Sequence, residues 1–157
     1  MSDNLAPQYT DGQRRLFVFA LVTVSALLIL GAQFWLFPQL QGFSAVAHCY
    51  DFFGVSGPAA LLYGILSGLP LLLALTLGSW FSWRGLRISR ARQSPLPGEK
   101  VFQSRPYVTG DKAAKIGVLH HLPMVLLLAF ALWGAVQAQG ILAGTSPLNV
   151  DYSLCSS

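Results

Sequence analysis

The sequence predicts an all-α membrane protein with three transmembrane helices, its N-terminus in the cytoplasm and its C-terminus on the extracytoplasmic side. Two observations lead to this fold class. Of the 157 residues, 54% are hydrophobic and only 10% are charged, whereas soluble domains carry about 25% charged residues. The apolar residues also gather in three runs, each longer than the roughly 18 residues that mark a membrane-spanning helix.

Uncharged stretches of the chain define the spans. The first covers about 16–37 and the second about 56–83, and neither contains a charged side chain. The third covers about 117–142, where two histidines and two glutamines interrupt the apolar run. At a rise of about 1.5 Å per residue, each helix is long enough to cross the roughly 30 Å of hydrocarbon. Few residues remain outside the spans, so we predict one integral membrane domain over 1–157.

The basic residues indicate how the chain is threaded. All 10 Lys and Arg residues lie before the first span or in the loop 84–116. The loop 38–55 and the tail 143–157 contain no cation, and their charges are Asp51 and Asp151. Lys and Arg in short loops remain cytoplasmic, so the basic loop is predicted inside and the other two segments outside. The formal net charge of +4 therefore reflects topology, and no nucleic-acid partner is expected.

A second interpretation makes the first span a cleaved signal peptide. The motif Ala45-Val46-Ala47 resembles a small-x-small cleavage site after Arg14 and Arg15 and an apolar run. That run is about 22 residues long, however, against roughly 7–15 in a signal peptide. We therefore expect a retained helix and a multi-pass protein of a plasma membrane, the bacterial inner membrane.

Small residues on the second span predict a helix contact face. They recur at every fourth position: Ser56, Ala60, Gly64 and Gly68. Small residues allow close helix approach in lipid, and this face serves either packing within the chain or contact with another subunit. Pro70 follows it and cannot donate a backbone hydrogen bond to Leu66, which predicts a kink.

Three glutamines lie near the extracytoplasmic ends of two spans. Gln33 belongs to the first span, and Gln137 and Gln139 belong to the third. Polar side chains inside a membrane are costly without a partner. Either Gln33 and Gln137 form a hydrogen bond between helices, or all three glutamines reach interfacial water.

Arginines at the end of the second span predict that its helix continues past the bilayer. They follow one another closely: Arg84, Arg87, Arg90 and Arg92. Such a row is expected to contact anionic lipid head groups or an acidic partner. Pro95, Pro97 and Gly98 then predict an irregular connector. The sequence has no Walker or Rossmann glycine pattern, which argues against a nucleotide site.

The two cysteines fall on the side predicted to be extracytoplasmic. An oxidising compartment favours a disulfide between Cys49 and Cys155. The alternatives are two free thiols, or a metal cluster with His48 and Asp51, although the spacing matches no standard zinc site. The sequence has no Cys-x-x-Cys motif, so thiol-disulfide catalysis is not expected.

His120 and His121 are the histidines of the third span. As neighbours on a helix they point about 100° apart, and the remaining histidine, His48, lies outside the spans in the loop 38–55. A haem held by two histidines is therefore not expected, and we interpret the pair as interfacial residues. No cofactor is expected. The spans contain no carboxylate, and ion-coupled transport commonly uses one.

These observations predict a non-enzymatic subunit, assembly factor or interaction partner of a larger membrane complex. Its expected partners are membrane lipids and other membrane proteins or copies of itself. One alternative is a transport or channel component, for which Gly64, Gly68 and the Pro70 kink are the motivation. The other is a membrane redox or cofactor-binding protein that uses His120, His121 or the extracytoplasmic cysteines.

Overall fold

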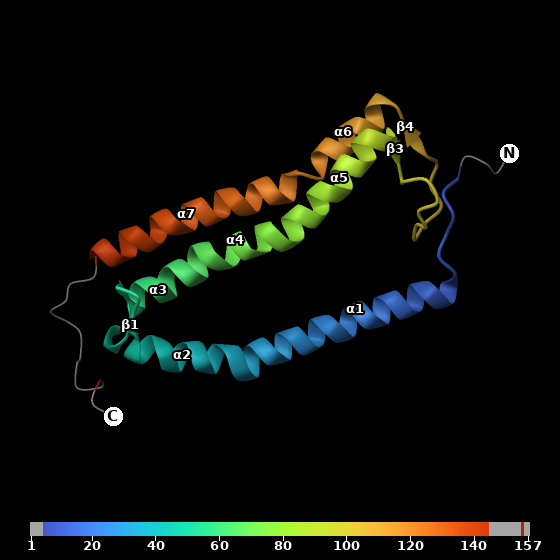
Figure 1. Cartoon of the computed structure of the whole chain (residues 1–157). Coiled ribbons are helices and arrows are strands. Elements are labelled where there is room, and N and C mark those ends of the chain that lie inside the picture. The colour runs from blue at the N-terminus through green and yellow to red at the C-terminus, as the bar shows by residue number, and fades with distance from the viewer. Residues whose placement is uncertain (1–4, 145–154, 156–157) are drawn as a thin grey trace. The chain divides into compact units, whose positions relative to one another are not determined.

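The computed structural model describes residues 5–144 and Cys155 and is mostly helical, at 76%. Three of its helical runs are long and apolar enough to cross a membrane: Asp11–Cys49, Gly57–Ala91 and Asp111–Gly144. Each run contains one of the predicted spans. The coarse prediction of three helices with the length and composition of membrane spans is therefore confirmed (Figure 1).

The first run extends beyond the predicted end of the first span. It comprises four consecutive elements: α1 (Asp11–Gly31), the π-helical segment η1 (Ala32–Leu36), α2 (Phe37–Val46) and the 3₁₀ turn η2 (Ala47–Cys49). Much of the predicted loop 38–55 is thus helical. Pro38 does not end the helix because it lies in the first turn of α2, where proline is well tolerated.

The second run contains two π-helical segments. Its elements are α3 (Gly57–Tyr63), π-helical η3 (Gly64–Gly68), α4 (Leu69–Leu73), π-helical η4 (Ala74–Gly78) and α5 (Ser79–Ala91). Pro70 is buried in the first turn of α4, directly after η3. The N–H of Leu69 donates to Gly64 O, five residues back. The helix therefore accommodates Pro70 by widening into a π turn just before it.

The third run is interrupted at the two histidines. Helix α6 (Asp111–Leu119) ends before them, and α7 (Leu122–Gly144) begins after them. The N–H of His120 donates to Gly117 O and that of His121 donates to Val118 O, so the chain tightens to three-residue spacing. Pro123 explains the break, because it has no N–H to continue the α-helical pattern across this turn.

The chain divides into two compact units, which are described separately. The first consists of residues 1–27 and 76–125. In it α5 and α6 lie side by side (Figure 1), and β3 (Gln93–Ser94) pairs antiparallel with β4 (Val108–Thr109). Gly85 and Gly117 are buried where the two helices meet. A Cβ at Gly117 would overlap Ser89 Oγ of α5, so the close approach of the two helices requires glycine at this position.

The second unit consists of residues 28–75 and 126–157. A hairpin of β1 (Asp51–Phe52) and β2 (Val55–Ser56) links η2 to α3 (Figure 1). Helix α7 buries a row of small residues: Ala131, Gly134 and Ala138. The backbone of Gly134 lies against the carbonyl oxygen of Leu66, which a Cβ would overlap. This carbonyl has lost its usual helical donor, because residue 70 is proline.

Candidate functional site

The N-terminal segment of the first unit is folded onto the connector after α5. The N–H of Ala6 donates to Arg105 O at 3.1 Å, and Val101 N–H donates to Pro7 O at 2.8 Å. Ala6 is 2% exposed. The rings of Tyr9 and Phe102 lie 5.4 Å apart. The connector predicted to be irregular is therefore ordered by a segment far away in the sequence.

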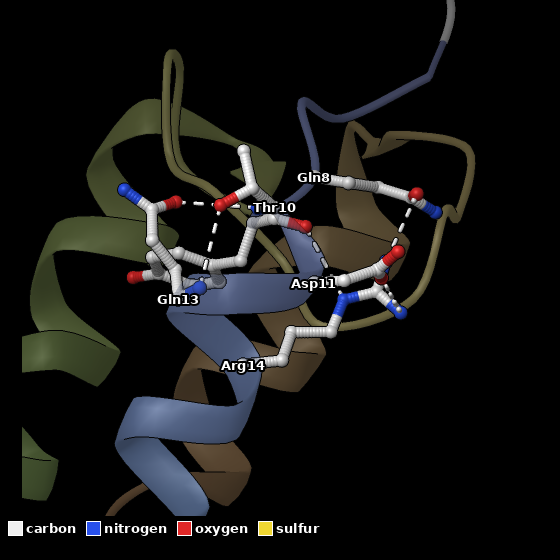
Figure 2. A network of polar contacts seen from close by, with 6 residues as sticks. Gln8, Thr10, Asp11, Gln13 and Arg14 are labelled. Atoms are coloured by element: carbon white, nitrogen blue, oxygen red, sulfur yellow. Dashed lines mark hydrogen bonds and ion pairs between the residues drawn. The ribbon is translucent and has the colours of Figure 1, made fainter.

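Polar side chains fix the start of α1 against this segment (Figure 2). Thr10 and Gln13 form a reciprocal capping box, with Gln13 N–H donating to Thr10 Oγ1 and Thr10 N–H donating to Gln13 Oε1. Arg14 donates to the carbonyl oxygen of Tyr9 and to Gln8 Oε1, both at 3.2 Å. One basic residue of the N-terminal tail thus holds the segment that covers the connector.

A pocket of about 460 Å³ opens between α5, the connector and α6. We call it the basic pocket. Its polar lining consists mainly of six side chains from four parts of the first unit: Tyr9, Arg84, Glu99, Lys100, Arg105 and His120. Three of these are permanent cations and one is a carboxylate. Apolar side chains complete the walls, among them Ile88 and Phe102.

Glu99 connects the connector to α5 inside the basic pocket. One carboxylate oxygen forms an ion pair with Arg84 at 2.5 Å. The other accepts the N–H of Leu96 at 2.9 Å. The Glu99 side chain is 23% exposed, so both interactions are partly protected from water. Glu99 therefore neutralises Arg84 and holds the connector in one conformation.

The adjacent histidines face different surroundings. His120 is half-buried, lines the basic pocket and has Nδ1 at 2.8 Å from Ile116 O. His121 lines a separate, mainly apolar pocket of about 780 Å³ along α6 and the start of α7. The structure does not bring the two rings to a common site.

The four predicted lipid-contacting arginines have different environments. Arg84 is in the basic pocket. Arg92 ends α5 in the left-handed conformation and pairs with Asp111 at 2.7 Å. Arg87 and Arg90 are exposed on α5. Lys100 and Arg105 were not among the predicted site residues, since contacts between distant segments, the Arg84–Glu99 ion pair and the pairing of residues 5–9 with 101–106, place them in the same pocket as Arg84.

In the second unit, Cys49 and Cys155 form a disulfide with a Cα–Cα distance of 5.4 Å. The predicted pairing is therefore present, and the alternative of free thiols is not. His48 has a ring nitrogen within 4.8 Å of both sulfurs. Asp51 instead accepts the N–H of Gly54 within the β1–β2 hairpin. The two sulfurs are bonded to each other, so the cysteines of this cluster form a disulfide and do not act as metal ligands. Asp151 lies outside the described residues.

Serine replacement of both Cys49 and Cys155 is expected to lower the free energy of unfolding by about 2 kcal/mol. A disulfide typically contributes about 2–4 kcal/mol to stability. We expect the lower value here, because helices that stay in the membrane already restrict the unfolded chain. The measurement is unfolding in mixed micelles under non-reducing conditions. Reducing the wild-type protein should reproduce the loss, whereas equal stability of all three forms would contradict the prediction.

The small-residue face predicted on the second span borders an open pocket and is not packed against a helix backbone. Ala60 and Gly64 line an apolar pocket of about 420 Å³ that also includes Leu40 and Phe43 of α2. Apart from its chain neighbours and the nearby backbone of its own helix, no atom of the described chain lies within 4 Å of a Cβ placed at Gly64, and a Cβ at Gly68 would approach only Tyr63 O of its own helix. Ser56 ends β2 and precedes α3 without a side-chain capping bond. Close backbone contacts of this unit lie instead at Gly134, against Leu66, and at Gly57, against Ala47.

Gln33 and Gln137 are not joined by a hydrogen bond among the described residues, and both are exposed. Gln33 lies in η1 and borders a groove with Leu61 and Ile65 of the second run. Gln137 lies on α7. The structure thus turns Gln33 toward the second span rather than toward Gln137.

Replacement of Gln33 by leucine should change the free energy of unfolding by less than about 0.5 kcal/mol, as expected for an exposed side chain. Gln137→Leu is the matched variant, because a shared hydrogen bond would make both variants equally unstable. Thermal unfolding in detergent measures the effect. A loss above about 1 kcal/mol in both variants would restore the hydrogen bond as an explanation.

The fold belongs to the class of helical proteins with several helices long and apolar enough to span a membrane. Comparisons with protein-family models, curated proteins and solved structures find no match to this chain. Any more specific function therefore has to be argued from its own residues.

Proposed function

We propose that this protein is a non-enzymatic subunit or assembly partner of a larger complex in the bacterial inner membrane. The observation that carries the proposal is the exposure of the first helix. None of the residues of α1 is buried, and Leu21 and Leu28 on one face are 68% and 69% exposed. Helices in lipid associate mainly through van der Waals packing, and because no residue of α1 is buried, a complete face of α1 is left for packing against a partner helix.

The charged groups of the described chain support a structural role. Glu99 is paired with Arg84, and Asp111 is paired with Arg92. The predicted spans 16–37, 56–83 and 117–142 carry no carboxylate, although buried acids are common in proton and ion pathways. The first pair holds the connector to α5 and the second joins the end of α5 to the start of α6, and such a structural use of charge suits a protein that positions other subunits.

The proposed orientation places the basic segments in the cytoplasm. All 10 Lys and Arg residues belong to the N-terminal tail or to the segment 84–116, in agreement with the positive-inside rule. The Cys49–Cys155 disulfide supports an oxidising environment at the other end of the spans.

The test is the composition of the complex that the tagged protein forms at low expression in a bacterial membrane. After mild-detergent purification, we expect one discrete assembly with partners in fixed ratio and a mass well above the 17.0 kDa of the chain. The double variant Leu21→Ala/Leu28→Ala should lose the partners while its helix content stays the same. Leu132→Ala, at an exposed position of α7, is the control. A wild-type protein that purifies alone and monodisperse would contradict the proposal.

A further inference from the structure

The basic pocket carries an excess of positive charge. Glu99 neutralises Arg84 through a short ion pair. Lys100 and Arg105 also line the pocket, and neither forms an ion pair within residues 5–144. Both cations are exposed residues at the edge of one pocket, and no carboxylate pairs with either of them among the described residues. Such a space attracts an anion that has room for more than one charged contact.

The backbone around these two cations is held in place before any ligand binds. Val101, next to Lys100, donates its N–H to Pro7 O, and the carbonyl of Arg105 accepts the N–H of Ala6. Glu99, on the other side of Lys100, is fixed by Arg84 and by the N–H of Leu96. A site with a fixed backbone loses less conformational entropy on binding than a mobile loop does.

The size and walls of the pocket indicate the kind of anion. Its volume of about 460 Å³ is within the roughly 300–1,000 Å³ of small-molecule sites. Ile88, Phe102 and Ile116 provide apolar wall beside the cations. The guanidinium of Arg105 suits the tetrahedral oxygens of phosphate. This combination fits a phosphate group attached to a partly apolar body.

The position of the pocket along α5 favours a lipid as the source of the phosphate. Trp80 and Trp83 are 70% and 66% exposed, and Arg84 of the pocket follows Trp83 directly. Exposed tryptophans mark the depth of the lipid head groups, and basic pockets at this depth bind anionic head groups. We propose that the basic pocket is a phosphate site, with Lys100 and Arg105 as the main contacts, and that it takes the head group of an anionic phospholipid.

The experiment compares two double variants that remove the same charge. Lys100→Gln/Arg105→Gln changes the basic pocket, whereas Arg87→Gln/Arg90→Gln changes exposed arginines outside it. Each protein is delipidated in detergent and titrated with phosphatidylglycerol, with phosphatidylcholine and with inorganic phosphate. Native mass spectrometry counts the bound lipid molecules, and the melting temperature reports phosphate binding. Equal melting temperatures without ligand show that both variants are folded.

We expect one tightly bound phosphatidylglycerol in the wild type and in Arg87→Gln/Arg90→Gln. The affinity should fall about tenfold or more in Lys100→Gln/Arg105→Gln, and phosphatidylcholine should bind weakly to all three proteins. Equal losses in both double variants, or a wild type that neither binds a discrete lipid nor is stabilised by inorganic phosphate, would overturn the proposal. Stabilisation by inorganic phosphate without any bound lipid would reject the head group as the source while retaining the phosphate site. If Lys100→Gln/Arg105→Gln already has a lower melting temperature without ligand, the single variants Lys100→Gln and Arg105→Gln replace it. Unchanged lipid binding in both single variants would also overturn the proposal.

Discussion

Replacement of Gly134 by alanine is expected to lower the free energy of unfolding by about 1–3 kcal/mol, the usual cost of overpacking a tight contact. The added Cβ would overlap the carbonyl oxygen of Leu66. Backbone cannot yield as a flexible side chain does, so α7 and the Pro70 region would have to separate. The measurement is reversible unfolding in mixed micelles, followed by the loss of helical signal.

Gly140→Ala is the matched control for this prediction. Gly140 lies on the same helix, six residues along, and a Cβ there has no atom of the described residues within 4 Å apart from its chain neighbours and the nearby backbone of its own helix. Alanine favours the helix over glycine by about 0.5–1 kcal/mol, so this variant should be as stable as the wild type or slightly more stable. Equal behaviour of the two variants would show that Gly134 does not form a tight contact.

Replacement of Gly117 by alanine is the second large effect that we expect, again with a loss of about 1–3 kcal/mol. A Cβ at Gly117 would overlap Ser89 Oγ and would lie 2.6 Å from Gly85 O. Ser89 Oγ also donates to Ala114 O at 3.3 Å, and this hydrogen bond would be broken. Protection of the α5 and α6 amides in hydrogen exchange would fall together with the stability.

Gly64→Ala separates the observed packing from the packing expected from the sequence. Gly64 belongs to the regularly spaced small residues of the second span, but it borders open space in the described chain. Gly64→Ala should therefore leave the protein at least as stable as the wild type. If Gly64→Ala were as destabilising as Gly117→Ala, the face at Gly64 would be a packed interface after all.

Hydrophobicity alone located the three helical runs, but it could not place their ends. A run of apolar residues shows which segment suits lipid, whereas a helix ends where its hydrogen bonds stop. Pro38 and Pro70 lie in first turns, where a missing N–H is tolerated. The helices therefore continue through both prolines. Pro123 also lies in a first turn, that of α7, but here the helix is interrupted just before it, at His120 and His121.

The site was only partly predictable for a related reason. The disulfide followed from topology, since both cysteines fall at the same end of the predicted spans. The row of arginines was visible, but Lys100 and Arg105 join Arg84 through the Glu99–Arg84 ion pair and the pairing of residues 5–9 with the connector. Such pairing between distant segments leaves no local pattern. The contact at Gly134 is similar, because spacing shows a small-residue face but not what lies opposite it.

The most direct test of the proposed membrane topology is single-cysteine labelling in intact cells with a membrane-impermeant maleimide. The background carries Cys49→Ser and Cys155→Ser, and one cysteine is introduced at Val55 or at Ser104, both of which are exposed. We predict that Val55→Cys is labelled in intact cells and that Ser104→Cys is labelled only after the inner membrane is permeabilised. Labelling of both positions in intact cells, or the reverse pattern, would contradict the three-span topology with a cytoplasmic N-terminus.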